Sequence, residues 1–195
     1  PILELALEAI RNFPKDIDAA DAIRRITERI YDFYVQHNLL DELKAEPGKR
    51  FTANGVIYSY ARNEVWQVGD CQCIIDNLYL SNEKEIDAIM ADVRAVVNEV
   101  ALLGGATMKD LESHDPGREF IYPFLQKQAL LQNCPIQGQP FSFSVFDGFP
   151  VQMEQVNIFP VGDAKEVVLA SDGYPHLYST LYASECYLAD ILEKD

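Results

Sequence analysis

The sequence predicts an α+β fold in which two antiparallel sheets stack face to face between helices, a four-layer α/β/β/α sandwich. The first observation is the order of hydrophobic periods along the chain, which runs helix, helix, strands, helix, helix, strands, helix. The second is that no repeat, low-complexity tract or linker divides residues 1–195, so we expect a single domain. The third is that 48% of the residues are hydrophobic, which is enough to fill one core.

Two helices are predicted at the start of the chain. Apolar residues recur at helical spacing from Ile2 to Ile10, and the segment 12–14, which ends in proline, interrupts the pattern. Asp18 followed by Asp21 is an N-terminal signature for the second helix. Its buried stripe is expected to contain Ile23, Ile26, Ile30 and Phe33.

Strand-like alternation follows the two helices. Runs at 56–60 and 64–68 flank a polar turn at Arg62-Asn63, and a third run extends over 71–80. We expect these runs to form an antiparallel meander. Trp66 lies among large apolar residues and is expected to be largely buried.

The middle of the chain returns to helical spacing. A helix is predicted over 83–103, and the glycine pair Gly104-Gly105 terminates it. We expect this helix to lie across the meander and cover one sheet. A further helix is predicted over 117–132, with a break or kink near Pro123.

The last third of the chain is predicted to complete the sheets. A strand pair should close at Asp147-Gly148 as a hairpin turn, so that residues 141–170 supply the second set of strands. The uninterrupted apolar run Val167–Ala170 predicts a strand over 166–170 that is covered on both faces. Two short helical segments follow, the last of which begins at Ser184.

Charge and hydropathy exclude several classes of partner. The net charge of −15 argues against nucleic acid, because phosphate-backbone binding requires clustered Lys and Arg. No segment approaches the roughly 20 apolar residues of a membrane span, and no signal-peptide pattern opens the chain. We therefore expect a cytoplasmic protein that binds neither nucleic acid nor membranes.

Four cysteines are too widely spaced for a secreted disulfide framework, so free thiols are expected. A zinc site remains an alternative, although the spacing does not fit a zinc ribbon. The cysteines are Cys71, Cys73, Cys134 and Cys186. The histidines lack the context of a nucleophilic or paired-metal motif and are expected to be solvated or capping groups.

Asp172 is the candidate metal ligand. It follows the predicted strand 166–170 directly, so a carboxylate would be held at the rim of a sheet, where a hard cation could bind. Gly173 removes side-chain bulk beside it and is able to adopt positive φ. The alternative is that Ser171-Asp172-Gly173 is ordinary turn chemistry after a strand.

Two short motifs carry a resemblance to a known family. The segment 65–71, Val-Trp-Gln-Val-Gly-Asp-Cys, is similar to the Gly-Asp-Ser strand motif of the metal-dependent type 2C (PPM-type) serine/threonine protein phosphatases. The segment 168–173, Val-Leu-Ala-Ser-Asp-Gly, resembles the Ser-Asp-Gly motif of the same family. The resemblance implies a two-sheet sandwich flanked by helices and hydrolysis of phosphoserine or phosphothreonine.

Carried over residue by residue, the resemblance makes Asp172 a ligand of Mg²⁺ or Mn²⁺, with Gly173 beside it. Asp70 matches a mainly structural aspartate, and Cys71 stands where the family usually has serine. The family's early Asp-Gly pair and late Asp-Asn or Asp-Asp pair have no counterpart, so we expect a domain that is incomplete at both ends. Asp147-Gly148 fits a hairpin turn better than a substitute for the missing pair.

Because these acidic residues are missing, two functional hypotheses remain. Two cations held by several carboxylates activate a water for attack on a phosphate monoester, and one carboxylate does not hold both. One hypothesis is a phosphatase-like domain that acts on a phosphorylated protein or a small phosphate ester when complete, with metal binding weak or absent in these 195 residues. The other is a catalytically inactive module for protein binding or regulation. An N-terminal nucleophile hydrolase is disfavoured because Pro1 carries no nucleophile.

Overall fold

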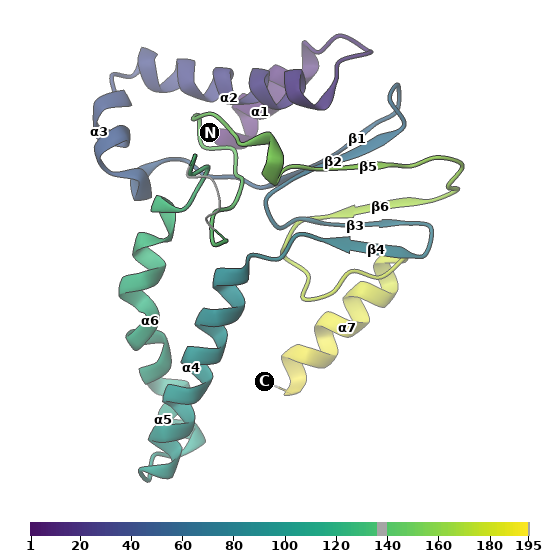
Figure 1. Cartoon of the computed structure of the whole chain (residues 1–195). Coiled ribbons are helices and arrows are strands. Elements are labelled where there is room, and N and C mark those ends of the chain that lie inside the picture. Colours follow the sequence, from purple (N-terminus) through teal and green to yellow (C-terminus); the bar gives the residue numbers. More distant parts are fainter. Residues whose placement is uncertain (136–139, 195) are drawn as a thin grey trace.

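The computed structural model describes residues 1–135 and 140–194 of the chain. It confirms the predicted α+β class: two three-stranded antiparallel sheets pack together, with helices outside them (Figure 1). No helix in the described ranges is both long and apolar enough to cross a membrane.

Helices at the N-terminal end cover the first sheet. They are α1 (Ile2–Arg11), α2 (Ala19–Gln36) and α3 (Leu40–Ala45), followed by the 3₁₀ turn η1 (Pro47–Lys49). Asp18 caps α2 as predicted, because its side chain accepts a hydrogen bond of 2.8 Å from the backbone N–H of Asp21 in the first turn. The buried stripe of α2 contains Ile23, Ile26, Ile30 and Tyr34, whereas Phe33 is half-buried.

The first sheet has the order β1-β2-β5. Its strands are β1 (Gly55–Ser59), β2 (Glu64–Val68) and β5 (Asn157–Pro160). Trp66 projects from the outer face of β2 and is only 2% exposed, which confirms the predicted burial. It packs against the segment that leads into α2 and the start of that helix, so α2 covers this face.

The second sheet has the order β4-β3-β6. Its strands are β3 (Gln72–Ile75), β4 (Leu78–Ser81) and β6 (Val167–Ala170). The two sheets meet face to face through a core centred on Val65 and Cys73, as predicted. Other members of this core are Val161, Val56, Ile75, Leu80, Phe159 and Val167.

The predicted strand 71–80 was wrong in its continuity. The chain turns back after β3 because Asp76 adopts a left-handed conformation with φ of 52°, and β4 returns antiparallel to β3. The predicted meander was also wrong, since the chain crosses from the first sheet to the second at Gly69-Asp70 between β2 and β3. Gly69 permits this crossing with φ of 81°.

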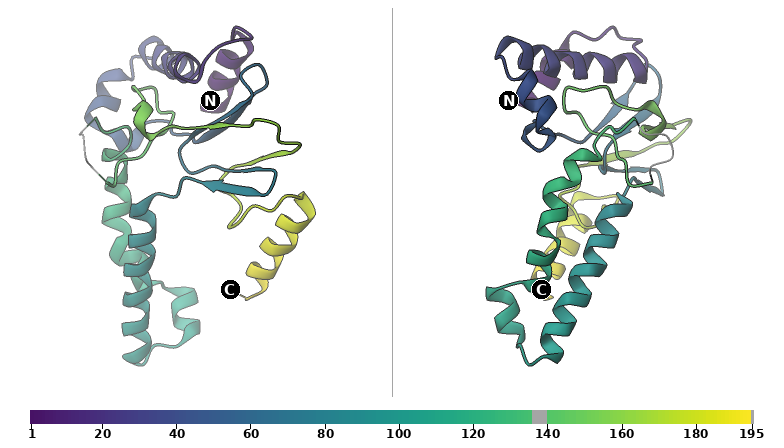
Figure 2. Two further views of the ribbon diagram at one scale, coloured as in Figure 1. Left: turned by 45° about the vertical axis from the view of Figure 1, so that its right-hand side comes forward. Right: turned by 60° about the vertical axis from the view of Figure 1, so that its left-hand side comes forward.

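The predicted helix 83–103 is present as α4 (Glu85–Leu103), but it does not lie across a sheet. It forms an antiparallel hairpin with α6 (Pro116–Lys127) that projects away from both sheets, with α5 (Met108–Ser113) at its tip (Figures 1 and 2). No residue of α4 is buried, so the expectation that this helix covers a sheet is overturned. Gly104 and Gly105 end α4 as predicted, and η2 (Gln128–Leu130) follows α6.

The predicted hairpin at Asp147-Gly148 does not form. Residues 141–149 make only isolated bridges to neighbouring segments, such as Phe146 with Ala53, and the 3₁₀ turn η3 (Met153–Gln155) then leads into β5. Gly148 adopts φ of 84° and lies against the Tyr34 ring, where a Cβ atom would come within 2.6 Å. This segment therefore closes the core under α2 instead of extending a sheet.

The C-terminal helix α7 (Leu181–Lys194) is one continuous helix and not the two predicted segments. It lies on the outer side of the second sheet, where the segment leading to it packs His176 against Tyr79 (Figure 1). β6 is an edge strand with Leu169 38% exposed, so the prediction of a strand covered on both faces was wrong.

Candidate functional site

The two motifs singled out in the sequence meet at one end of the second sheet. β3 and β6 pair antiparallel with Gln72 opposite Ala170, so the residues that precede β3 lie beside those that follow β6. Asp70 and Asp172, which are 102 positions apart in the sequence, consequently line the same pocket of about 370 Å³. The sheet register brings both carboxylates to one place.

Asp70 is held by neutralising contacts. The Lys84 Nζ atom lies 2.5 Å from Asp70 Oδ2, and the Asn54 amide donates to the other carboxylate oxygen. Both members of the ion pair are mostly buried, with side chains 15% and 16% exposed. Lys84 also lies 3.8 Å from Asp87 in the first turn of α4. Asp70 therefore ties the crossing between the sheets to the start of α4, and its charge is already balanced.

Asp172 has a different environment. It is exposed in the turn after β6 and makes no hydrogen bond or ion pair with any residue in the described ranges. Its carboxylate is nevertheless close to Cys71: burial raises the pKa of that thiol to about 11, and the charge of Asp172 contributes next, before that of Asp70. Asp172 thus offers a carboxylate whose oxygens are free to bind a ligand.

The expectation for Gly173 is not supported by its backbone. Gly173 is absent from the residues with positive φ, and a Cβ atom there would meet only the Ser171 hydroxyl at 3.4 Å. Its backbone N–H donates to that hydroxyl over 3.4 Å, which is a local turn contact. The turn therefore does not require glycine for steric reasons, and the metal role of Gly173 stays a prediction.

The pocket at this end mixes acids with one lysine and aromatic rings. Its polar lining also includes Gln72, whose amide nitrogen donates to the Tyr174 carbonyl at 2.6 Å and whose amide oxygen accepts from the Tyr79 hydroxyl at 3.0 Å. Within the described residues, no three His, Cys, Asp or Glu side chains are grouped so as to hold a metal ion. Glu83 and Asp87 also line this pocket but are not grouped with Asp172 in such a cluster, so Asp172 with water suits weak magnesium binding.

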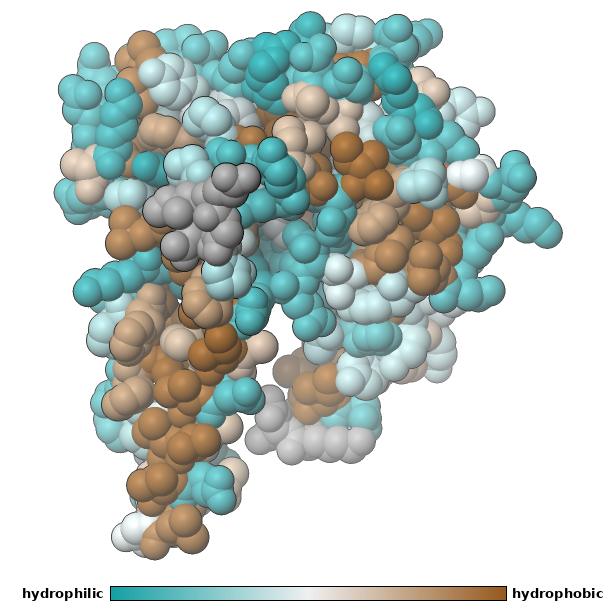
Figure 3. All heavy atoms as spheres, in the orientation of Figure 1, coloured by the Kyte–Doolittle hydropathy of each residue, from teal (hydrophilic) through white to brown (hydrophobic). Residues whose placement is uncertain are grey.

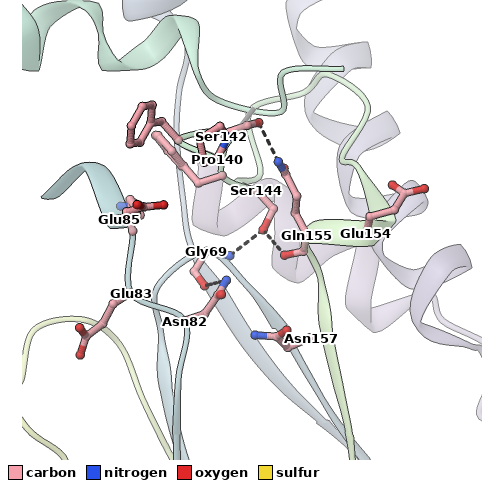
Figure 4. A pocket seen from close by; sticks show the side chains of 13 residues that line it. Gly69, Asn82, Glu83, Glu85, Pro140, Ser142, Ser144, Glu154, Gln155 and Asn157 are labelled. Carbon is pink, nitrogen blue, oxygen red and sulfur yellow. Dashed lines mark hydrogen bonds between the residues drawn. The ribbon is translucent and has the colours of Figure 1, made fainter. Parts of the chain in front are cut away.

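A second pocket of about 280 Å³ shares Glu83 and Lys84 with the first in its lining (Figure 4). Ser144 anchors it, because its hydroxyl accepts from the Gly69 N–H at 3.1 Å and donates to the Gln155 carbonyl at 3.0 Å. Asn82 donates to the Gly69 carbonyl at 3.0 Å. These hydrogen bonds fix the backbone of the crossing segment at Gly69.

Asp147 is no substitute for the missing metal acids. It is fully buried, and its carboxylate pairs with Arg50 at 3.0 Å and accepts from Asn133 at 2.9 Å. Burial raises the pKa of Asp147 against the opposing effects of the Phe149 N–H and of Arg50. The role is structural: the pair joins the segment after η1 to the loop that closes the core.

Thiol and imidazole chemistry is also disfavoured. Burial raises the pKa of Cys73 to about 11, as it does for Cys71, so neither is a ready thiolate nucleophile. All four cysteines are free, as predicted. His37 and His114 are the C-terminal cap residues of α2 and α5, which agrees with the expected capping role.

The sequence reasoning missed Lys84 and Arg50, the two cations that neutralise Asp70 and Asp147. Comparison with known proteins adds no assignment, because the chain matches no protein-family model, no curated protein and no solved structure.

Proposed function

We propose that this chain is a domain similar to the type 2C metal-dependent protein phosphatases, which hydrolyses phosphate monoesters when all of its acidic ligands are present. One observation carries the proposal: the Asp70 and Asp172 motifs, distant in sequence, converge on a single pocket at the end of a two-sheet sandwich. The substrate class is a phosphorylated protein or a small phosphate ester. The cofactor is Mg²⁺ or Mn²⁺.

In this proposal Asp172 is the residue that binds the metal. It is exposed, makes no ion pair in the described part of the chain and lies on a turn that follows a strand. Divalent ions in such sites activate a water and neutralise charge developing on the phosphoryl oxygens. Asp70 positions the crossing segment and cannot serve freely as a second ligand, because Lys84 already neutralises it. Further carboxylates would have to come from beyond these 195 residues.

The test compares the 195-residue chain with the longest open reading frame that encodes it. We expect the short chain to bind Mn²⁺ weakly at most and to show no turnover of p-nitrophenyl phosphate. The long protein should hydrolyse the ester in Mn²⁺, lose activity with chelator and lose it again in Asp172→Ala. Asp163→Ala, which removes an exposed acid from the turn before β6, is the matched control and should leave turnover unchanged.

A second function, an inactive module for protein binding or regulation, is favoured by the Lys84–Asp70 pair. The buried Lys84 ammonium lies 2.5 Å from the Asp70 carboxylate and neutralises it, so this carboxylate attracts a metal cation less strongly. Absence of metal-dependent turnover in the long protein would support this function over the first. Turnover by the short chain that survives Asp172→Ala would instead remove this residue from the mechanism.

A further inference from the structure

In the helical hairpin, one side of α4 packs against α6. Asp115, the N-cap of α6, accepts from Arg94 and Asn98 of α4 at 2.7 and 3.0 Å. At the other end of the hairpin, Gln128 donates to Asp87 at 2.7 Å. These contacts fix which side of α4 faces α6, and residues on the side away from them are substantially exposed.

A second apolar stripe runs along that free side of α4. Apolar residues alternate at spacings of three and four, the pattern of a helix that packs against another helix. Four of its members are substantially exposed: Ile89 by 37%, Val96 by 59%, Val100 by 63% and Leu103 by 83%. Ile86 and Val93 complete the stripe and are half-buried. Figure 3 shows apolar residues gathered along the visible face of this hairpin.

α6 widens the same face. Phe120 and Phe124 are each 58% exposed and lie one turn apart on α6. Because α4 and α6 are antiparallel, helical geometry places these two rings on the side where the α4 stripe emerges. The result is a two-helix apolar face, which we call the hairpin face, formed by the α4 stripe together with Phe120 and Phe124.

One border of the hairpin face is acidic. Glu85, Asp92 and Glu99 recur every seventh residue of α4, immediately beside the stripe, and all three are exposed. None of them forms an ion pair or a side-chain hydrogen bond with a residue that the structure describes. Two of the three acids of α2, Asp21 and Glu28, are by contrast paired with Arg24. Within the described residues, the α4 stripe is therefore an exposed apolar surface bordered by a row of unpaired carboxylates.

We propose that the hairpin face docks a basic amphipathic helix of a partner protein, with apolar residues against the stripe and Lys or Arg beside the acidic row. Acids flanking an apolar seam select a helix of opposite charge. A second copy of this chain is disfavoured, because antiparallel pairing would oppose Glu85 to Glu99 and Asp92 to Asp92 in two chains of net charge −15. The inference does not depend on the proposed phosphatase function.

The binding test uses synthetic helical peptides of about 20 residues, matched to the 19-residue α4. The first has Leu at the core positions and Lys at the flanking ones, the second has Glu in place of Lys, and the third scrambles the first. Fluorescence anisotropy with labelled peptide should show saturable binding of the basic peptide alone. Binding should weaken as salt rises, because the flanking charges are exposed.

Variants locate the binding to the hairpin face. Val96→Asp should weaken the basic peptide at least about tenfold, because it places a charge in the centre of the contact. Tyr60→Asp, which changes an 87% exposed apolar residue in the β1–β2 turn, is the matched control. Asp92→Lys with Glu99→Lys should also weaken binding at low salt by roughly tenfold. Asp163→Lys with Glu154→Lys changes the same charge elsewhere and should have no effect.

Three results would overturn the proposal. Equal binding of the acidic and basic peptides would remove the charge complementarity, and unchanged binding by Val96→Asp would place the contact elsewhere. A concentration-dependent dimer in sedimentation velocity that Val96→Asp dissociates would assign the face to a second copy. Circular dichroism of each variant identifies any loss of helix before binding is compared.

Discussion

Trp66 shows how one side chain stabilises the contact between a sheet and its covering helix. The ring is 2% exposed and packs against Ile17, Ala19 and Ala22, and its Nε1 atom donates to Glu64 at 2.9 Å. We expect Trp66→Ala to lower the free energy of unfolding by about 3 to 5 kcal/mol through cavity formation. Urea denaturation measures this, and a loss below about 1 kcal/mol would mean that the site collapses around the smaller residue.

At the residue scale, the sequence predicted buried apolar positions better than charge pairs. Trp66 and the isoleucines of α2 follow from local periodicity, which depends on near neighbours only. Arg50 and Asp147 are 97 positions apart, so nothing local indicates that they form a buried pair. The same holds for Lys84, which reaches Asp70 only because the chain crosses between sheets at Gly69.

At the scale of elements, helices with explicit caps were predicted well and strands with hidden turns were not. Asp18 indicates the start of α2, because an N-cap hydrogen bond involves only the next three residues of the chain. Residues 71–80 divide into β3 and β4 because the chain turns at Asp76, which adopts φ of 52°. The apolar pattern continues through this turn and therefore does not indicate it. α3 and α5, each six residues long, were also missed because short helices carry too little periodicity.

The N-cap of α6 gives a prediction with a defined pH dependence. The Arg118 N–H, followed by Arg94 and Asn98, lowers the pKa of Asp115 to about 2. A folded pKa below the ordinary value of roughly 3.9 means that the stabilisation is complete above about pH 4 and is lost as pH falls toward 2. Asp115→Ala should therefore cost about 1 to 2 kcal/mol at pH 7.

The measurement is urea denaturation of both proteins at pH 7 and at pH 3. The gap in unfolding free energy between Asp115 and its alanine variant should narrow at the lower pH, because the unfolded chain, with an ordinary carboxyl pKa of about 3.9, then binds a proton that folded Asp115 mostly does not. A gap that widens at pH 3 would contradict the assigned direction of the pKa. Asp110 is not a suitable control, since it forms the capping box of α5 with Thr107.

Close backbone approach within the hairpin gives a third prediction. A Cβ atom on Gly117 would come within 2.4 Å of the Arg94 carbonyl oxygen. Gly117→Ala should therefore destabilise the hairpin by about 1 to 3 kcal/mol through overpacking. Gly173→Ala is the matched control and should change stability by less than about 0.5 kcal/mol, since its nearest neighbour is a hydroxyl at 3.4 Å. Thermal unfolding of the two variants measures their stability, and an equal loss of stability in both would contradict the close packing of Gly117 against Arg94.

For the whole molecule, the layers were predictable and the placement of α4 was not. Two stacked antiparallel sheets follow from the order of hydrophobic periods. α4 is apolar on more than one side, so its sequence does not specify whether it covers a sheet or pairs with α6. The convergence of Asp70 and Asp172 was suggested only by a resemblance, because strand register is a long-range property that one sequence does not display.

The four thiols differ in burial, so their alkylation rates can report how often the two sheets separate. Cys186 is exposed on α7 and should react with iodoacetamide quickly in the native state. Cys71 and Cys73 are buried, the latter in the core between the sheets, and their pKa of about 11 leaves almost no thiolate at neutral pH. Their alkylation should therefore wait for the sandwich to separate, so mass spectrometry of labelled peptides over time would give its opening rate without any added probe.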